Sequence, residues 1–317
     1  MKQSYFLLFI ILFSFASFSQ KKVNKKCVQE EKSLTVTTCN IKGTLLLPKK
    51  MKGKVPVVIF IAGSGPTDRD GNNSTMKNNS LKMMAEELCL NGIASFRYDK
   101  RMIAESVDTI LKEKDLRFET YINDAVEVIN FIKKDERFSQ VIIAGHSEGS
   151  LIGMVAAQKT KVDKYISLAG VGVSADIILK KQLASKITIK EESYAVIDSL
   201  KKGILVDSLS ESIQAIFRPS VQPYIISWFK YNPQTEIAKL KIPVLIVQGT
   251  TDIQVDTTNA ELLHKALPNS ELYIIKDMNH LLKQCTDDRT ENLKTYFNPD
   301  VPLNTELIGI LAKFIKK

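Results

Sequence analysis

Short apolar runs alternate with amphipathic segments along most of the chain. The run at 56–62 (PVVIFIA) is apolar throughout and of strand length, which is typical of a strand buried on both faces of a parallel sheet. The segment at 80–91 carries its apolar residues at helical spacing and ends before Gly92, a helix stop signal. The same criteria predict further strands at 34–37, 41–47, 93–98, 141–145, 165–169, 243–248 and 271–275, and further helices at 121–132, 151–157, 259–266 and 305–315.

The alternation of strands and helices predicts an α/β fold with an open, mostly parallel sheet flanked by helices. Residues 34–37 and 41–47 read as a hairpin around the polar turn at 38–40. The segment from about 173 to 240 interrupts the alternation and is helical in pattern at 177–187 and 193–202. We expect it to be a helical lid, inserted between two strands and covering their carboxyl ends, where open α/β sheets bind ligands.

Residues 1–19 have the pattern of a secretory signal peptide. Lys2 precedes an apolar run at 5–18, and Ser17 and Ser19 are small residues suited to a cleavage site before Gln20. The run is shorter than the roughly 20 residues that span a bilayer, although an uncleaved anchor is the alternative. We therefore expect residues 20–317 to form one exported domain, periplasmic or secreted, with no stable membrane span after cleavage.

The composition narrows the function classes. Of the 317 residues, 44% are apolar and 25% are charged, which excludes a disordered chain. The net charge of +9 could suit nucleic acid, but the basic residues are scattered among acidic ones and no nucleic-acid motif is present. We expect no nucleic-acid partner. With three histidines and no Cys/His cluster at zinc spacing, we expect no metal site.

Four cysteines are present, and export would permit disulfides between them. Four cysteines allow three fully paired connectivities, among which the sequence does not choose. Cys27 and Cys39 are close in the chain, so a local bridge between them is plausible. Cys89 lies in an apolar helical stretch and reads as a buried thiol, and Cys285 stands apart near the C-terminus.

The strongest chemical signal is Gly145-His146-Ser147-Glu148-Gly149, a G-x-S-x-G motif between a predicted strand and a predicted helix. That context is the one required for a nucleophile elbow. Gly145 and Gly149 remove side chains that would clash in so sharp a turn. Ser147 then projects from the bend, and the following helix N-terminus stabilises negative charge that develops beside it. Ser147 is therefore the candidate nucleophile.

A serine hydroxyl needs a base, usually a histidine oriented by a carboxylate. Among the three histidines, His146 adjoins the nucleophile and is expected to point elsewhere, and His264 lies inside a predicted helix. His280 follows the last predicted strand, in a loop at its carboxyl end, and is the candidate base.

The orienting acid is expected between the serine and the histidine in chain order. Asp252 lies just past the strand at 243–248, and Asp256 is its rival four residues later. Asp252 has the better placement and is the candidate acid.

Acyl transfer also needs hydrogen-bond donors for an oxyanion. One candidate is the backbone N–H of Glu148, directly after the nucleophile. The second is the backbone N–H of Ser64, in the Gly63-Ser64-Gly65-Pro66 turn that follows a strand. The polar stretch at 67–72 could shape the mouth of a pocket or form a salt-bridged structural loop.

With these motifs in order, the chain resembles the α/β-hydrolase family, and most closely its bacterial esterase-like and serine aminopeptidase-type members. The resemblance covers about residue 41 to the C-terminus and rests on the stretches 63–72, 97–101, 145–149, 243–255 and 279–280. It implies a mostly parallel sheet, a helical cap and hydrolysis of carboxylic esters without a cofactor. The chain departs from the family at Met102, where a glycine is usual, and at Ala62, where many relatives have a histidine.

Tyr224, Trp228 and Phe229 lie in the expected lid and are candidates for a substrate pocket, with plain packing as the alternative. We expect an exported serine hydrolase acting on small to medium esters through an acyl-enzyme intermediate. A peptidase with the same triad is a second reading, which needs a lid acid to hold a substrate ammonium; the lid glutamates are Glu191, Glu192 and Glu211. A non-catalytic binding protein on the same scaffold is the third, and the sequence leaves the oligomeric state open.

Overall fold

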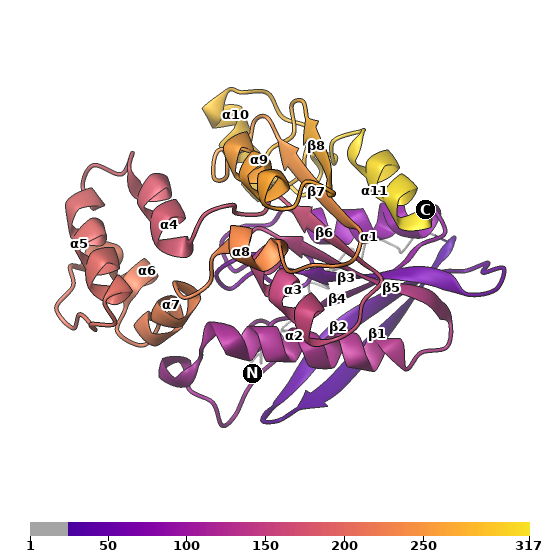
Figure 1. Ribbon diagram of the computed structural model, residues 1–317, viewed down its shortest axis with the longest axis horizontal. Coiled ribbons are helices and arrows are strands. Elements are labelled where there is room, and N and C mark those ends of the chain that lie inside the picture. The colour runs from indigo at the N-terminus through magenta and orange to yellow at the C-terminus, as the bar shows by residue number, and fades with distance from the viewer. Residues whose placement is uncertain (1–24) are drawn as a thin grey trace, which may run out of the picture.

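A computed structural model of the protein describes residues 25–317, so the predicted signal peptide at 1–19 lies outside the described residues. The described part contains one eight-stranded sheet with helices on both of its faces (Figure 1). The strands are β1 (Cys27–Val36), β2 (Cys39–Pro48), β3 (Val55–Ile61), β4 (Ala94–Tyr98), β5 (Phe138–His146), β6 (Lys164–Leu168), β7 (Val244–Gly249) and β8 (Glu271–Ile275). The helices are α1 (Ser80–Leu90), η1 (Glu113–Asp115), α2 (Phe118–Lys133), α3 (Glu148–Lys159), α4 (Ala175–Leu183), α5 (Lys190–Lys201), α6 (Glu211–Phe217), α7 (Gln222–Trp228), α8 (Pro233–Ile237), α9 (Thr257–Ala266), α10 (Arg289–Lys294), η2 (Thr295–Phe297) and α11 (Leu307–Lys316).

The strands lie in the order β1-β2-β4-β3-β5-β6-β7-β8. β2 pairs antiparallel with both β1 and β4, and the pairs from β4 to β8 are all parallel. The carboxyl ends of these parallel strands therefore meet at one edge of the sheet, where ligands bind in open α/β folds. The predicted α/β class with a mostly parallel sheet is confirmed.

Both faces of the central strands are buried, which explains their continuous apolar runs. In β3, Val57 and Ile59 belong to one core, while Val58 and Phe60 alternate with them and belong to the other. The first core is completed by α2, α3 and α9, and the second by α1 and α11. A strand that buries residues on both faces shows no polar alternation, as the sequence pattern predicted.

The β1–β2 hairpin is longer than the sequence pattern predicted. β1 begins at Cys27 rather than near residue 34, and it pairs in register with the whole of β2. Most of β1 is at least partly exposed, since it is the edge strand of the sheet. A search for apolar runs misses this strand because Gln29 to Ser33 are polar. Charged side chains are nevertheless common on edge strands.

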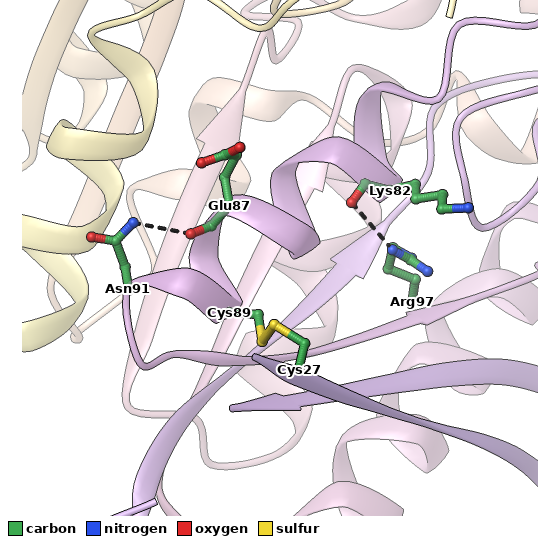
Figure 2. The surroundings of a disulfide bond; sticks show 6 residues. All are labelled: Cys27, Lys82, Glu87, Cys89, Asn91 and Arg97. Atoms are coloured by element: carbon green, nitrogen blue, oxygen red, sulfur yellow. Dashed lines mark hydrogen bonds between the residues drawn. A yellow bond between two sulfur atoms is a disulfide. The ribbon is translucent and has the colours of Figure 1, made fainter. Parts of the chain in front are cut away.

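The register of the hairpin also determines whether Cys27 can form a disulfide with Cys39. Cys27 stands at the open end of the hairpin opposite Pro48, whereas Cys39 adjoins the turn opposite Val36. Nine residues of strand separate the two ends, which is roughly 30 Å at about 3.3 Å per residue, so the expected Cys27–Cys39 bridge is wrong. Figure 2 shows that Cys27 instead bonds Cys89 of α1. Cys89 is therefore not the free thiol expected, and the free thiols are the buried Cys39 and Cys285.

The segment at 173–240, named here the helical insertion, lies between β6 and β7 and contains α4 to α8. α4 to α7 gather at one side of the sheet, at the left of Figure 1, and α8 lies beside α3. α7 packs on α2 through aromatic rings, with Trp228 stacked on Phe118 at 6.0 Å between ring centroids.

Within residues 25–317, no helix has the length and apolar character needed to cross a membrane.

Candidate active site

Ser147 occupies the sharp turn between β5 and α3. Its backbone has φ 54° and ψ −120°, a conformation that a residue with a side chain rarely adopts. Its N–H donates to the carbonyl oxygen of Leu168 at 2.9 Å, which ties the turn to the end of β6. A strained residue held in this way is a feature of functional sites and of the nucleophile elbow in particular.

Gly145 and Gly149 allow this turn because each is pressed against backbone. A Cβ at Gly145 would lie 2.3 Å from the carbonyl oxygen of Gly149, and a Cβ at Gly149 would lie 2.3 Å from that of Ile61. Any side chain at either position would push α3 away from β5 or from β3. The two glycines of the motif therefore set how closely the helix follows the strand, as the sequence analysis expected.

The structure brings the candidate base and acid together. His280 lies in the loop after β8, and its Nδ1 is 2.7 Å from Oδ2 of Asp252, in the loop after β7. Both side chains are buried, with 4% and 0% of their surface exposed. Ser147 and His280 line the same cavity. Asp256, by contrast, is at the N-terminus of α9 and pairs with Lys181 in solvent.

The Asp252 carboxylate has four hydrogen-bond partners, of which His280 is one. Its Oδ1 accepts the backbone N–H groups of Gln254 and Val255 at 2.8 and 2.9 Å, and its Oδ2 also accepts Nε2 of Gln248 at 2.8 Å. Burial by itself would raise the pKa of Asp252, but the charge and hydrogen bond of His280 and the two backbone donors lower it below its usual value. The carboxylate is thus kept ionised and aimed at His280. The sequence analysis missed Gln248, the next-to-last residue of β7 and a buried polar side chain in an apolar strand.

His146 was expected to point away from the site, and this is wrong. Its Nε2–H donates to the backbone carbonyl oxygen of His280 at 2.8 Å, and the two imidazole rings lie 4.9 Å apart between centroids. Burial, with a smaller effect from the charge of His280, lowers the pKa of His146 to about 4. His146 is therefore neutral at pH 7 and supports the loop that carries His280. The Nδ1 of His264 lies 2.9 Å from Oγ of Ser270, just beyond the end of α9, in agreement with a packing role.

The turn after β3 lies directly against the nucleophile. A Cβ at Gly63 would lie 3.2 Å from Cβ of Ser147, so any other residue here would make a tight contact with the nucleophile. Ser64 follows at the cavity wall, and Glu148 begins α3 on the other side of Ser147. The two backbone positions expected to supply oxyanion donors therefore flank Ser147.

A cavity of about 220 Å³ opens beside Ser147 and His280. Its lining includes Asn73, Met76 and Asn78 of the loop at 63–80, and also Gln254 and Tyr296. The polar stretch at 67–72 does both things that the sequence analysis considered. Gly71 lines the cavity, and Arg69 forms an ion pair with Asp99 at 2.8 Å.

The aromatic residues expected in the pocket lie elsewhere. Tyr224 and Trp228 are buried against Phe118 of α2, and the cavity lining that the structure describes contains no residue of the helical insertion. Phe229 is partly buried in the same core. The packing alternative describes these side chains better than the pocket hypothesis. Tyr224 does reach the site indirectly, because its hydroxyl donates to Oε1 of Glu148 at 2.7 Å.

The turn at Met102 keeps a backbone shape that favours glycine. Met102 has φ 66°, in the left-handed region, and its N–H donates to the carbonyl oxygen of Ser106 at 2.8 Å. The departure from the family pattern at this residue thus changes the side chain and leaves the turn in place.

Within residues 25–317, no group of three or more His, Cys, Asp or Glu side chains is placed to hold a metal ion.

Comparisons with known proteins agree with this architecture. A family model described as BD-FAE matches residues 44–267, and Esterase EstD of Thermotoga maritima is 29% identical over 267 residues. That alignment covers 80% of this chain and 60% of the relative, so the chain spans about 60% of the length of the relative.

Two solved structures show the same fold at lower identity. Est1E of Butyrivibrio proteoclasticus, solved with ferulic acid bound, is 18% identical with a TM-score of 0.62, covering 90% of this chain and 100% of the other. The α/β hydrolase GrgF of Penicillium sp. sh18 is 16% identical with a TM-score of 0.59, covering 91% and 98%. The family match over most of the chain, with this sheet and this elbow, shows that the chain belongs to the BD-FAE family and has the α/β-hydrolase fold.

Proposed function

We propose that the protein is an exported serine hydrolase that cleaves small to medium carboxylic esters. The observation that carries the proposal is the contact between Nδ1 of His280 and Oδ2 of Asp252, which are 2.7 Å apart. His280 lines the same cavity as Ser147, whose backbone is strained. The similarity to an esterase over 80% of the chain supports the same reaction.

In the proposed mechanism, Oγ of Ser147 attacks the acyl carbon while His280 takes its proton. Asp252 holds the imidazole in the tautomer that leaves Nε2 free to accept, and stabilises the imidazolium that forms. The backbone N–H groups of Ser64 and Glu148 bind the oxyanion. His280 then protonates the leaving alcohol, and afterwards deprotonates the water that cleaves the acyl-enzyme.

The cavity favours an uncharged substrate. The lining residues that the structure describes include no Asp, Glu, Lys or Arg, and the volume of about 220 Å³ suits a small acyl or alcohol group. A peptidase acting on N-terminal residues would need a carboxylate for the substrate ammonium. Glu192 of the helical insertion instead bonds Ser210 in solvent, and none of the residues 25–317 that line the cavity is an Asp or Glu. The ester reading is therefore the better supported of the two.

Export is the second element of the proposal. The Cys27–Cys89 disulfide joins two residues far apart in the chain, and structural disulfides persist in oxidising compartments. Together with the apolar N-terminal run, this supports a periplasmic or secreted protein.

The test combines labelling with turnover. A fluorophosphonate probe is expected to label wild-type protein at Ser147, and p-nitrophenyl acetate, p-nitrophenyl butyrate and methyl ferulate are offered as esters beside aminoacyl arylamides. Ester turnover without arylamide turnover supports the proposal, and preferential arylamide cleavage would favour the peptidase reading. Ser147→Ala is expected to abolish turnover with the circular dichroism unchanged; retained activity would refute the mechanism.

Asp252→Asn and Asp256→Asn form a matched pair for the acid. The first is expected to lower kcat about 10⁴-fold, because the amide favours the wrong tautomer of His280. The second removes a surface carboxylate that has no contact with His280 and is expected to leave kcat unchanged. The reverse result would show that the acid is misassigned.

A further inference from the structure

Lys100 is a buried lysine that the proposed mechanism leaves without a role. It follows β4, and only 2% of its side chain is exposed. Its Nζ donates to the backbone carbonyl oxygen of Gly63 at 2.6 Å and to Oε2 of Glu148 at 3.2 Å. A buried ammonium is costly unless it is paired, so these two bonds account for its position. They join the two segments that flank Ser147.

The bond to Gly63 controls a particular peptide group. The Gly63 carbonyl and the Ser64 N–H belong to the same planar unit, and the described residues contain no cis peptide bond. In a trans peptide the C=O and N–H point in opposite directions. Holding the Gly63 oxygen toward Lys100 therefore fixes the direction of the Ser64 N–H, and it also polarises that N–H as a donor.

The bond to Glu148 acts on the other side of the nucleophile. Glu148 is the first residue of α3, and its backbone N–H is the second expected oxyanion donor. Its carboxylate is shared between Nζ of Lys100 and the hydroxyl of Tyr224, which comes from α7 of the helical insertion. Three buried side chains thus connect the insertion, the start of α3 and the turn after β3.

We propose that Lys100 is a positioning residue that holds both backbone donors of the oxyanion hole in place, through the Gly63 carbonyl and the Glu148 carboxylate. This inference rests on the proposed function, since it concerns an oxyanion that forms in acyl transfer. Both acylation and deacylation pass through such an intermediate, so loosening the donors slows both steps together.

The first test is Lys100→Met, which keeps the length of the side chain and removes the ammonium. Loss of one oxyanion donor lowers kcat by about 10²–10³-fold. In Lys100→Met both donors remain but are held less firmly, so kcat is expected to fall by a smaller factor, about 10- to 100-fold. KM is expected to stay within about twofold, because an interaction made only in the transition state is lost. The affinity for phenylboronic acid, which forms a tetrahedral adduct with a serine, is expected to fall by the same factor as kcat/KM.

The double variant Lys100→Met/Glu148→Gln separates positioning from charge. In the single variant the Glu148 carboxylate is left without its cation and could itself repel an oxyanion. The double variant removes that charge but leaves the Gly63 carbonyl unheld, so it is expected to stay as slow as the single variant. It also avoids a buried unpaired charge, and it replaces the single variant if that one does not fold.

Lys164→Met is the matched control. Lys164 is a buried lysine whose Nζ donates to the carbonyl oxygens of Phe314 and Ile315 at 3.0 and 2.9 Å, at the end of α11 and away from the cavity. It is expected to lower the melting temperature and leave kcat and boronate affinity unchanged.

Two results would overturn the inference while leaving the proposed function intact: wild-type turnover in the double variant, or losses in the Lys100 variants no larger than in Lys164→Met. If wild-type protein neither binds the fluorophosphonate probe at Ser147 nor cleaves esters, the proposed function itself is wrong.

Discussion

The disulfide between Cys27 and Cys89 is expected to contribute much of the stability of this fold. It joins the first residue of β1 to α1, across 62 positions of sequence. The perturbation is the double variant Cys27→Ala/Cys89→Ala, which removes the crosslink and adds no buried polar group. Both side chains are buried in the core between the sheet and α1, so their replacement also removes a small amount of packing.

The magnitude follows from the closed loop. For a loop of this length, the chain-entropy relation gives a stabilisation of about 4 kcal/mol at 25 °C, acting mainly on the unfolded chain. Local strain and residual structure in the unfolded chain reduce such values, so a loss of about 3–4 kcal/mol in the free energy of unfolding is expected. That is a large fraction of the 5–15 kcal/mol typical of a domain.

The assay is urea unfolding followed by circular dichroism, with and without a phosphine reductant. The reductant is expected to lower the unfolding free energy of wild-type protein by most of its difference from the double variant, the small remainder being the lost packing, and to leave the double variant unchanged. Cys39→Ala is the control, because Cys39 is a buried free thiol: its loss removes packing and weak S–H contacts with the carbonyl oxygens of Ser106 and Val107, but no crosslink. Recovery of a Cys27–Cys39 peptide by non-reducing mapping, or a wild-type curve that the reductant does not move, would refute the reasoning.

Two further predictions concern backbone and charge. Burial lowers the pKa of His146 from 6.5 to about 4, so the unfolded chain takes up a proton at a higher pH than the folded protein does. The free energy of unfolding should therefore decrease as the pH falls from 6.5 to 4, by up to about 3 kcal/mol. His146→Gln, whose amide can still donate to the His280 carbonyl, should lose that part of the pH dependence, which chemical denaturation at a series of pH values measures. At Met102, φ 66° disfavours any side chain, so Met102→Gly should be more stable than Met102→Ala by about 1 kcal/mol in urea unfolding. Equal stability of the two variants would show that the turn relaxes.

The sequence by itself determined the fold class and the edge of the sheet at which Ser147, Asp252 and His280 lie. Apolar runs buried on two faces identify parallel strands, and the carboxyl ends of such strands share one edge of a sheet. Residues that follow β5, β7 and β8 therefore lie along the same edge of the sheet. This is why Ser147, Asp252 and His280 could be selected from loop positions alone, and why Asp252 could be preferred to Asp256.

Only the tertiary structure decided which residues support that edge. The disulfide depends on strand register, because a hairpin ten residues long on each side separates Cys27 from Cys39 and places Cys27 beside α1. The roles of His146 and Lys100 depend on contacts between residues 134 and 37 positions apart, which no local pattern encodes. Short-range periodicity reports which side of an element is buried; the identity of the neighbour on that side is settled by how the layers pack.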